Sequence, residues 1–279
     1  MAEVFLLGEF CEHKTAVIIG FTTGIGAVIA RLLAKLGCSR IIIFGRNETW
    51  AASILQDMQK LAPHKIQVEY IKSDLSDTKG MRASAKAIQN AVMEHGIDYL
   101  VMCQNGVPTG MIVENADDIE RGFAVQAVSR FAIAFFLTTW GCLAQNAQCL
   151  SVANVGQTFK AGRGKTMSFM DQSKRDRCVL DAFTEFLFKE FNIRYPQYRY
   201  HQVSYGKFPF PLNGLMMIGM KIIGTTPDAF ANVPVYVTPP NFQLSSYFQP
   251  QILLAPEGQD ILGSGKFLAY NLAQKEPGA

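Results

Sequence analysis

Near the start of the sequence, a short apolar run ends in glycine and leads directly into an amphipathic segment. Residues 15–20, TAVIIG, are apolar and rich in β-branched side chains, which is typical of a buried strand. Residues 27–36, AVIARLLAKL, place apolar side chains at helical spacing and stop before Gly37. A strand that turns at glycine into a helix is the first unit of an α/β fold.

The same alternation of apolar strands and amphipathic helices continues to about residue 204. We expect further strands at 40–44, 67–71, 98–103, 148–153 and 199–204, and further helices at 48–61, 79–94, 119–143 and 167–191. Alternation of this kind requires a parallel sheet with helices on both faces. The sequence therefore predicts a Rossmann-like, doubly wound parallel α/β sheet, with all of residues 1–279 in a single domain.

The composition excludes several classes of protein. Of the 279 residues, 49% are hydrophobic, which is enough to bury a large core and excludes a wholly disordered chain. The formal net charge is +3 without a basic run, so we expect no nucleic acid as a partner. Only 18% of the residues are charged, against about a quarter in an average protein, so the surface is short of charge.

The cysteines and the apolar stretches indicate the compartment. Six cysteines occur without a C-x-x-C pair or interleaved histidines, so we expect no metal site and no disulfide framework. Residues 1–14 carry acidic side chains where a signal peptide carries a basic one. Residues 131–144 are apolar but number only 14, fewer than the roughly 20 that span a bilayer. We expect a soluble, cytoplasmic protein without a transmembrane segment.

Residues 20–26, GFTTGIG, form the turn between the first strand and the first helix. Glycine lets the backbone approach a pyrophosphate, whose charge the helix N-terminus favours; the alternative is a plain strand-to-helix turn. With Ile19 in place of threonine, residues 19–26 resemble the T-G-x-x-x-G-x-G motif of the short-chain dehydrogenase/reductase family. A looser resemblance extends over about residues 14–206. It implies nucleotide binding by Gly20, Thr22, Thr23, Gly24, Ile25 and Gly26.

Arg46 and Asn47 follow the second predicted strand, where an NAD-specific site has Asp or Glu for the ribose 2′-hydroxyl. An arginine can instead accept a 2′-phosphate, so we predict NADP(H) as the cofactor; the alternative is an ordinary exposed arginine. The resemblance further implies that Asp74 and Leu75 contact the adenine. It also implies a cofactor-binding role for Asn105, in the segment that represents the family's N-N-A-G. The nucleotide-binding part then covers about residues 14–130.

The resembled family reduces carbonyls with a tyrosine and with a lysine four residues later on the same helix face. No Y-x-x-x-K occurs anywhere in this chain. Residues 168–174, SFMDQSK, resemble the end of the family's Y-x-A-S-K, which puts Lys174 in the lysine place and Met170 in the tyrosine place. Methionine cannot donate a proton, so these residues do not support the ordinary ketoreductase mechanism. Lys174 can still contact the nicotinamide ribose.

Two further places of the family's catalytic tetrad are changed. Counting back from Gly156, the family's serine falls on Ala153, with Ser151 or Asn154 as substitutes if the register shifts. The family's F-x-V-N on the central helix is FAVQ here, so Gln126 takes the asparagine place. We take Ser151, Asn154 and Gln126 as candidate catalytic residues.

Other side chains can replace the missing proton donor. Asp171, next to the missing tyrosine, is a candidate general acid or base; the alternative is a solvated carboxylate near a helix start. Tyr205, after the sixth strand, can replace the lost phenol; the alternative is core packing. We expect Arg130, on the long central helix, to reach solvent or an interface.

The second half of the chain, about residues 131–279, is assigned to the substrate side. Residues 207–224 include an uncharged, methionine-rich run that suits a lid over a bulky apolar ligand. The alternatives are a surface for a partner or membrane, and ordinary core. Residues 131–144 fall on the helix that commonly forms the dimer interface in the resembled family, so we expect a homodimer.

These observations predict an enzyme that is related to the reductases and acts on a hydrophobic small molecule, which we expect to be a secondary metabolite. Because the tyrosine and serine are missing, we favour a non-redox isomerisation, cyclisation or dehydration. Two alternatives remain at this stage. One is an NADPH-dependent ketoreductase with a non-standard proton donor, and the other is a non-catalytic protein that binds NADP(H).

Overall fold

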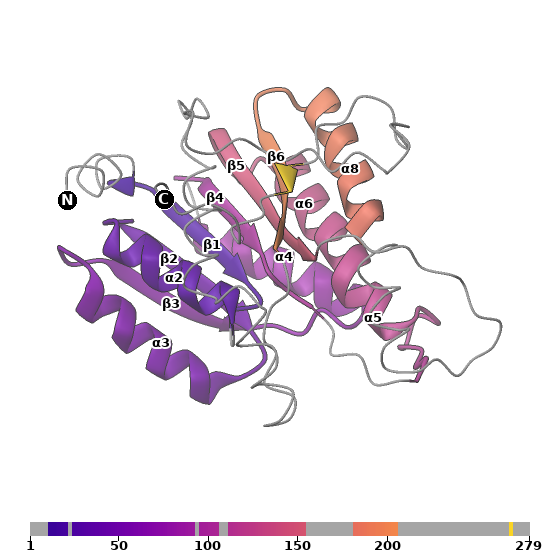
Figure 1. The fold of residues 1–279 in the computed structure, drawn as a ribbon, viewed down its shortest axis with the longest axis horizontal. Coiled ribbons are helices and arrows are strands. Elements are labelled where there is room, and N and C mark those ends of the chain that lie inside the picture. Colours follow the sequence, from indigo (N-terminus) through magenta and orange to yellow (C-terminus); the bar gives the residue numbers. More distant parts are fainter. Residues whose placement is uncertain are drawn as a thin grey trace, which may run out of the picture.

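The computed structural model describes residues 11–21, 24–92, 95–105, 111–154, 181–205 and 268–269. Its sheet has seven parallel strands in the order β3-β2-β1-β4-β5-β6-β7 (Figure 1). The strands are β1 (Thr15–Ile19), β2 (Arg40–Gly45), β3 (Gln67–Lys72), β4 (Ile97–Met102), β5 (Leu143–Asn154), β6 (Arg199–Tyr205) and β7 (Leu268–Ala269).

The helices alternate with these strands along the chain. They are α2 (Ile25–Lys35), α3 (Glu48–Leu61), α4 (Thr78–Val92), α5 (Arg121–Phe123), the π-helix η1 (Ala124–Val128), α6 (Ser129–Thr139) and α8 (Asp181–Arg194). The predicted helix at 167–191 overlaps α8 from residue 181 onward, and its earlier residues lie outside the described part of the chain.

The predicted end of the long central helix at residue 143 is wrong. α6 ends at Thr139, and the N–H groups of Gly141 and Cys142 donate to the carbonyls of Thr138 and Leu137. Gly141 has φ 68°, so it turns the chain out of the helix. β5 therefore begins at Leu143, five residues before the start that the apolar pattern predicts.

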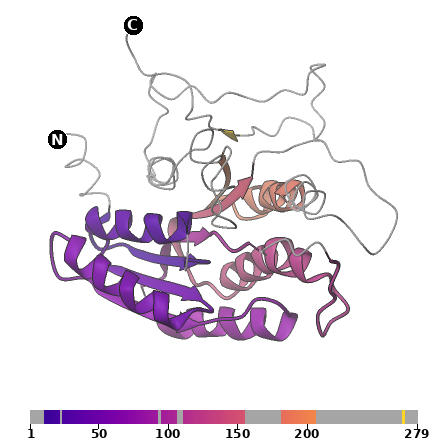
Figure 2. The ribbon, with the colours of Figure 1, turned by 60° about the horizontal axis from the view of Figure 1, so that its bottom comes forward.

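Alternate residues of each central strand enter two separate hydrophobic cores. On β1, Ala16 and Ile18 belong to the core that packs under α2 and α3. Val17 and Ile19 belong to the core under α4, α6 and α8. Helices thus cover both faces of the sheet (Figure 2), which confirms the predicted doubly wound α/β fold.

The strand order reverses between β1 and β4. From β1 the chain moves outward through β2 and β3, and it then returns to place β4 on the other side of β1. In sheets of this kind, ligands bind beyond the carboxyl ends of the strands at such a reversal. The carboxyl ends of β1 and β4 lie next to each other here, since the Cys103 N–H, just after β4, donates to the Ile19 carbonyl at the end of β1 over 2.8 Å.

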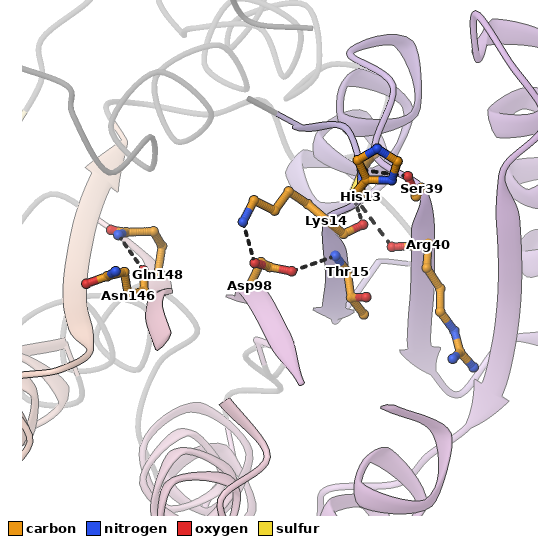
Figure 3. A network of polar contacts seen from close by, with 9 residues as sticks. His13, Lys14, Thr15, Ser39, Arg40, Asp98, Asn146 and Gln148 are labelled. Carbon is orange, nitrogen blue, oxygen red and sulfur yellow. Dashed lines mark hydrogen bonds and ion pairs between the residues drawn. The ribbon is translucent and has the colours of Figure 1, made fainter. Parts of the chain in front are cut away.

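Polar contacts hold the opposite, amino ends of the central strands together (Figure 3). The Lys14 ammonium contacts one carboxylate oxygen of Asp98 at 2.8 Å, and the other oxygen accepts a hydrogen bond from the Thr15 N–H. The Lys14 carbonyl accepts from the Arg40 N–H, which links β1 to β2. These contacts stabilise β1 between its neighbours and lie at the end of the sheet away from the reversal site.

The continuous helical segment Arg121–Thr139 has 19 residues and a mean hydropathy of 1.4 over its most apolar window, of which half is buried. Among the described residues it is the one stretch long and apolar enough for a membrane span by length and composition. The core helix of a soluble protein meets the same two conditions, and α6 contributes Ile133, Ala134 and Leu137 to the second core. This stretch is therefore weak support for a span.

Candidate functional site

The turn after β1 leaves no room for a side chain at Gly20. Gly20 has φ +79°, and a Cβ there would lie 2.5 Å from the backbone nitrogen of Gln104, just beyond β4. A Cβ at Gly26, in the first turn of α2, would lie 2.6 Å from the Gly20 carbonyl oxygen. The two glycines let β1, β4 and α2 approach closely, and they leave bare backbone at the carboxyl end of β1.

Helix α2 begins without the side chains that usually close a helix N-terminus. Its N-cap is Gly24, no side chain among the described residues makes a capping hydrogen bond, and its first turn, which includes Ile25, contains no acidic residue. The N–H groups of that turn and the positive end of the helix dipole are therefore suited to an anion. Phe21 is fully buried and packs edge-on against Tyr70, which anchors the turn in the core.

The predicted adenine-side residues follow two neighbouring strands. Gly45 at the end of β2 pairs with Lys72 at the end of β3, so Arg46 and Asp74 emerge at the same edge of the sheet. Both are exposed, and Arg46 makes no hydrogen bond or ion pair with any residue that the structure describes. One Asp74 carboxylate oxygen accepts from the Ser76 N–H over 3.0 Å.

The other two predicted residues at this edge have structural contacts. The Asn47 side chain is the N-cap of α3, where its Oδ1 accepts from the Trp50 N–H over 3.1 Å. Leu75 is 7% exposed and belongs to the second core. Of the four predicted residues at this edge, Arg46 thus has the side chain that is most free to bind a phosphate.

Arg130 is fully buried, so the expectation that it reaches solvent or an interface is wrong. It lies in the first turn of α6, and its guanidinium joins the carboxyl ends of β4 and β5. Nη1 donates to Ser151 Oγ over 2.8 Å, and Nη2 donates to the carbonyls of Val152 and Gln104 over 2.9 and 3.0 Å. Nη2 also contacts Asn105 Oδ1 at 2.9 Å. These hydrogen bonds compensate for the cost of burying the guanidinium.

A second contact attaches the end of β4 to the same helix. Gln104 Nε2 donates to Ser129 Oγ over 3.0 Å, and Ser129 Oγ donates to the Val125 carbonyl over 2.5 Å. Gln104 is 5% exposed, and its Oε1 accepts no hydrogen bond within the described part of the chain. We call Arg130, Gln104, Asn105, Ser129 and Ser151 the Arg130 cluster.

The π-helix η1 directly precedes Arg130. The Ser129 N–H donates to the carbonyl of Ala124, five residues earlier, and the candidate Gln126 lies within this turn at 2% exposure. A single π turn inserts an extra residue into a helix and is frequent at functional sites. The extra residue changes which side chains of the helix face the strand ends.

Cys103, between β4 and the Arg130 cluster, is a poor candidate for thiolate chemistry. Burial raises the pKa of its thiol to about 12, and the nearby Arg130 cation lowers it only in part. The thiol is therefore protonated at neutral pH, and the thiolate is the form that acts as a nucleophile.

The structure brings two predicted residues together, because Arg130 contacts both Ser151 and Asn105. Asn154 and Tyr205 are paired at the ends of β5 and β6, but their side chains are outside the description, as is that of Ala153. Thr22, Thr23, Asp171, Lys174 and the predicted lid at 207–224 lie outside the described residues.

Sequence reasoning missed the role of Arg130, although a signal was present. Arg130 stands three to four residues from Ala127 and Ala134, which are both buried. It therefore falls on the inward stripe of the helix, and a charged side chain there requires polar partners.

The comparisons with known proteins agree with this geometry. The sequence model of the family described as short chain dehydrogenase matches residues 14–140, which include the Gly20 turn, the end of β4 and Arg130. This part of the chain belongs to the short-chain dehydrogenase/reductase family. The predicted family resemblance is thus confirmed.

Two curated relatives are similar to about half of this chain. Oxidoreductase calI of Penicillium decumbens is 28% identical over 131 residues, which are 47% of this chain and 37% of that protein. Retinol dehydrogenase 12 of Bos taurus is 31% identical over 139 residues, 48% of this chain and 42% of that protein. The chain thus spans less than half the length of the curated relatives it matches.

A solved short-chain dehydrogenase/reductase structure supports the fold. A metagenomic short-chain oxidoreductase in complex with NADP superposes with a TM-score of 0.56 at 18% identity, over 82% of this chain and 91% of that chain. The superposition extends well beyond residue 140. At this identity the likeness concerns the fold alone.

Proposed function

We propose that this family member binds NADP(H) across the carboxyl ends of β1, β2 and β4 and uses it to interconvert a carbonyl and an alcohol on a hydrophobic small molecule. The observation that carries the proposal is that Gly20 and Gly26 leave bare backbone at the end of β1, beside a helix N-terminus whose N-cap, Gly24, makes no side-chain capping hydrogen bond. The names of the relatives, an oxidoreductase and a retinol dehydrogenase, and the NADP complex of a neighbour support this reaction class.

The residues present fit such a cofactor. The first turn of α2 offers N–H donors to a pyrophosphate, Arg46 offers an unoccupied guanidinium to a 2′-phosphate, and Asp74 lies at the same sheet edge for the adenosine. NADP(H), when bound, supplies or accepts the hydride. The chain must then move a proton at the reacting oxygen, and our candidates for that step are Asp171, Tyr205 and water, with Lys174 at the nicotinamide ribose.

Replacing Arg46 with aspartate tests the cofactor assignment. The wild-type chain is expected to bind NADPH at least tenfold more tightly than NADH, because a charge-assisted bidentate contact to phosphate contributes about 1.5–3 kcal/mol. The variant is expected to reverse that preference, since a carboxylate repels the phosphate and accepts from a 2′-hydroxyl. Calorimetric titration of both proteins with both nucleotides measures it. Equal affinities of wild type and variant for NADPH would remove Arg46 from the site.

A second candidate function is the non-redox isomerisation, cyclisation or dehydration of a similar substrate. The observation that favours it is the absence of any Y-x-x-x-K from the sequence, with Met170 in the tyrosine place. Incubation with NADPH and a panel of hydrophobic carbonyl compounds separates the two. Loss of nicotinamide absorbance together with alcohol formation supports the reductase. Conversion of a substrate at constant absorbance supports the second candidate, and tight NADPH binding without any conversion supports a non-catalytic role.

The substrate and setting are proposed on the composition of the second half of the chain. The methionine-rich segment at 207–224, which is uncharged over residues 208–220, suits a lid over an apolar secondary metabolite, and the cytoplasm is the proposed compartment. An Asp171→Asn variant that retains full turnover would exclude Asp171 as the proton donor.

We also propose a homodimer through α6 and α8, where exposed aromatic side chains gather. Phe131 and Phe135 are 36% and 40% exposed and stack at 5.7 Å on α6, and Phe186 on α8 is 53% exposed. Phe135→Glu is expected to convert a dimer into a monomer, as measured by light scattering after gel filtration. Trp50→Glu, at an exposed aromatic on α3, is the matched control and should leave the mass unchanged. A monomeric wild type would contradict the proposal.

A further inference from the structure

The guanidinium of Arg130 determines how its neighbours can hydrogen-bond. Arginine has five N–H donors and no acceptor, so every polar atom that contacts it must present a lone pair. At Asn105, the amide oxygen must therefore face Arg130, and the 2.9 Å contact is made by Oδ1. The two N–H groups on Nδ2 then point away from the guanidinium.

Within the described part of the chain, the Asn105 Nδ2 is a hydrogen-bond donor without an acceptor. Asn105 is partly buried, directly after Gln104 at the end of β4, and its Nδ2 donates to no group among the described residues. Partly buried amide groups of this kind are usually satisfied by a protein group, by water or by a ligand.

Ser151 is constrained in the same way on the neighbouring strand. Its Oγ accepts from Arg130 Nη1, so its own O–H cannot point back to the guanidinium. A hydrogen bond from a charged donor also polarises the hydroxyl and makes its proton a stronger donor. At the adjoining ends of β4 and β5, Arg130 thus leaves two neutral side chains with donor groups.

These donors lie where the nicotinamide half of the proposed cofactor is expected to bind. The Gly20 turn touches Gln104, so a pyrophosphate bound on that turn lies beside the end of β4. Arg46 and Asp74 lie on the β2 and β3 side of β1, which is assigned to the adenosine half. The nicotinamide half then extends to the opposite side, over β4 and β5.

We propose that Arg130 is a positioning residue that orients the Asn105 amide so that its Nδ2 donates to an oxygen acceptor on the nicotinamide half of the dinucleotide. The inference rests on the proposed binding of NADP(H). Arg130 thereby orients the Asn105 amide, and Asn105 binds the cofactor through Nδ2 alone.

Asn105→Asp isolates the donor from the rest of the side chain. A carboxylate keeps the oxygen that Arg130 binds and replaces the N–H groups with a second acceptor. We expect Asn105→Asp to melt at or above the wild-type temperature and to bind NADP⁺ about tenfold more weakly, the effect of one lost hydrogen bond. Asn105→Ala removes both the oxygen that Arg130 binds and the Nδ2 donor. It should therefore melt at a lower temperature than wild type and also bind NADP⁺ about tenfold more weakly.

Adenosine 2′,5′-bisphosphate is the matched control ligand, because it carries the adenosine half without the nicotinamide. Its affinity should be the same for wild type and Asn105→Asp, which also controls for the added negative charge. If the wild type binds neither ligand by calorimetry, the proposed cofactor is wrong. If the wild type binds both and Asn105→Asp binds NADP⁺ as tightly as wild type, the role of the Nδ2 donor is wrong. If Asn105→Asp melts well below wild type, Arg130 does not impose the amide orientation.

Discussion

Replacing Arg130 with methionine is expected to lower the free energy of unfolding by about 3–5 kcal/mol, because it removes the shared donor of several buried acceptors. Methionine fills much of the volume of arginine and donates no hydrogen bond. Ser151 Oγ, Asn105 Oδ1 and the carbonyl of Val152 would lose the contacts that the guanidinium makes at 2.8–2.9 Å. Urea unfolding of the full chain, followed by circular dichroism, measures the change.

Arg31→Met is the matched control for this experiment. Arg31 lies on α2 and pairs with Asp57 at 2.9 Å, with both side chains about a third exposed, so its loss should cost less than about 1 kcal/mol. Arg130→Lys should fall between the two, since a single ammonium cannot reach oxygens on both strands with the geometry of the fork. An Arg130→Met variant that unfolds at the same urea concentration as Arg31→Met would contradict the role assigned to the cluster.

Gly20→Ala is expected to lower the free energy of unfolding by about 3–5 kcal/mol and to abolish measurable binding of NADPH. Two costs add at this position. The backbone has φ +79°, and the new methyl group would overlap the backbone of Gln104, which cannot move without displacing the end of β4. Thermal unfolding and calorimetric titration of the same sample measure both effects.

Gly141→Ala separates the two costs. Gly141 has φ +68° but no atom within 4 Å of an added Cβ, so its replacement carries only the backbone strain, about 1–2 kcal/mol. The difference between the two variants reports the close approach of the turn to β4. If Gly20→Ala is no less stable than Gly141→Ala and binds NADPH normally, the turn is not the tight phosphate-binding element described above.

Local patterns predicted the strands and helices of the nucleotide half because the hydrophobic pattern within each element identifies it as a strand or a helix. The run at β1 is uninterrupted and apolar, and α2 repeats its buried side chains at helical spacing. The glycines were also predictable, since a strand, a tight turn and a helix in sequence require them. These features depend on residues that are close together along the chain.

The interior of the candidate site was not predictable in the same way. The partners of Arg130 lie 21 to 26 residues away along the chain, and two of them are backbone carbonyls, which leave no mark on the side-chain pattern. The π turn before Arg130 depends on how the helix meets the strand ends. The register of β5 determines that Ser151 faces this helix. Counting along the motif alone did not decide whether Ala153, Ser151 or Asn154 takes the place of the family's serine.

The crystal structure of the full chain with NADP⁺ tests the central claim most directly. The account predicts the pyrophosphate on the turn between Gly20 and Gly26, the 2′-phosphate within hydrogen-bond distance of Arg46, and the nicotinamide half beside Asn105. A dinucleotide bound away from the carboxyl ends of β1 and β4, or none at saturating NADP⁺, would contradict it.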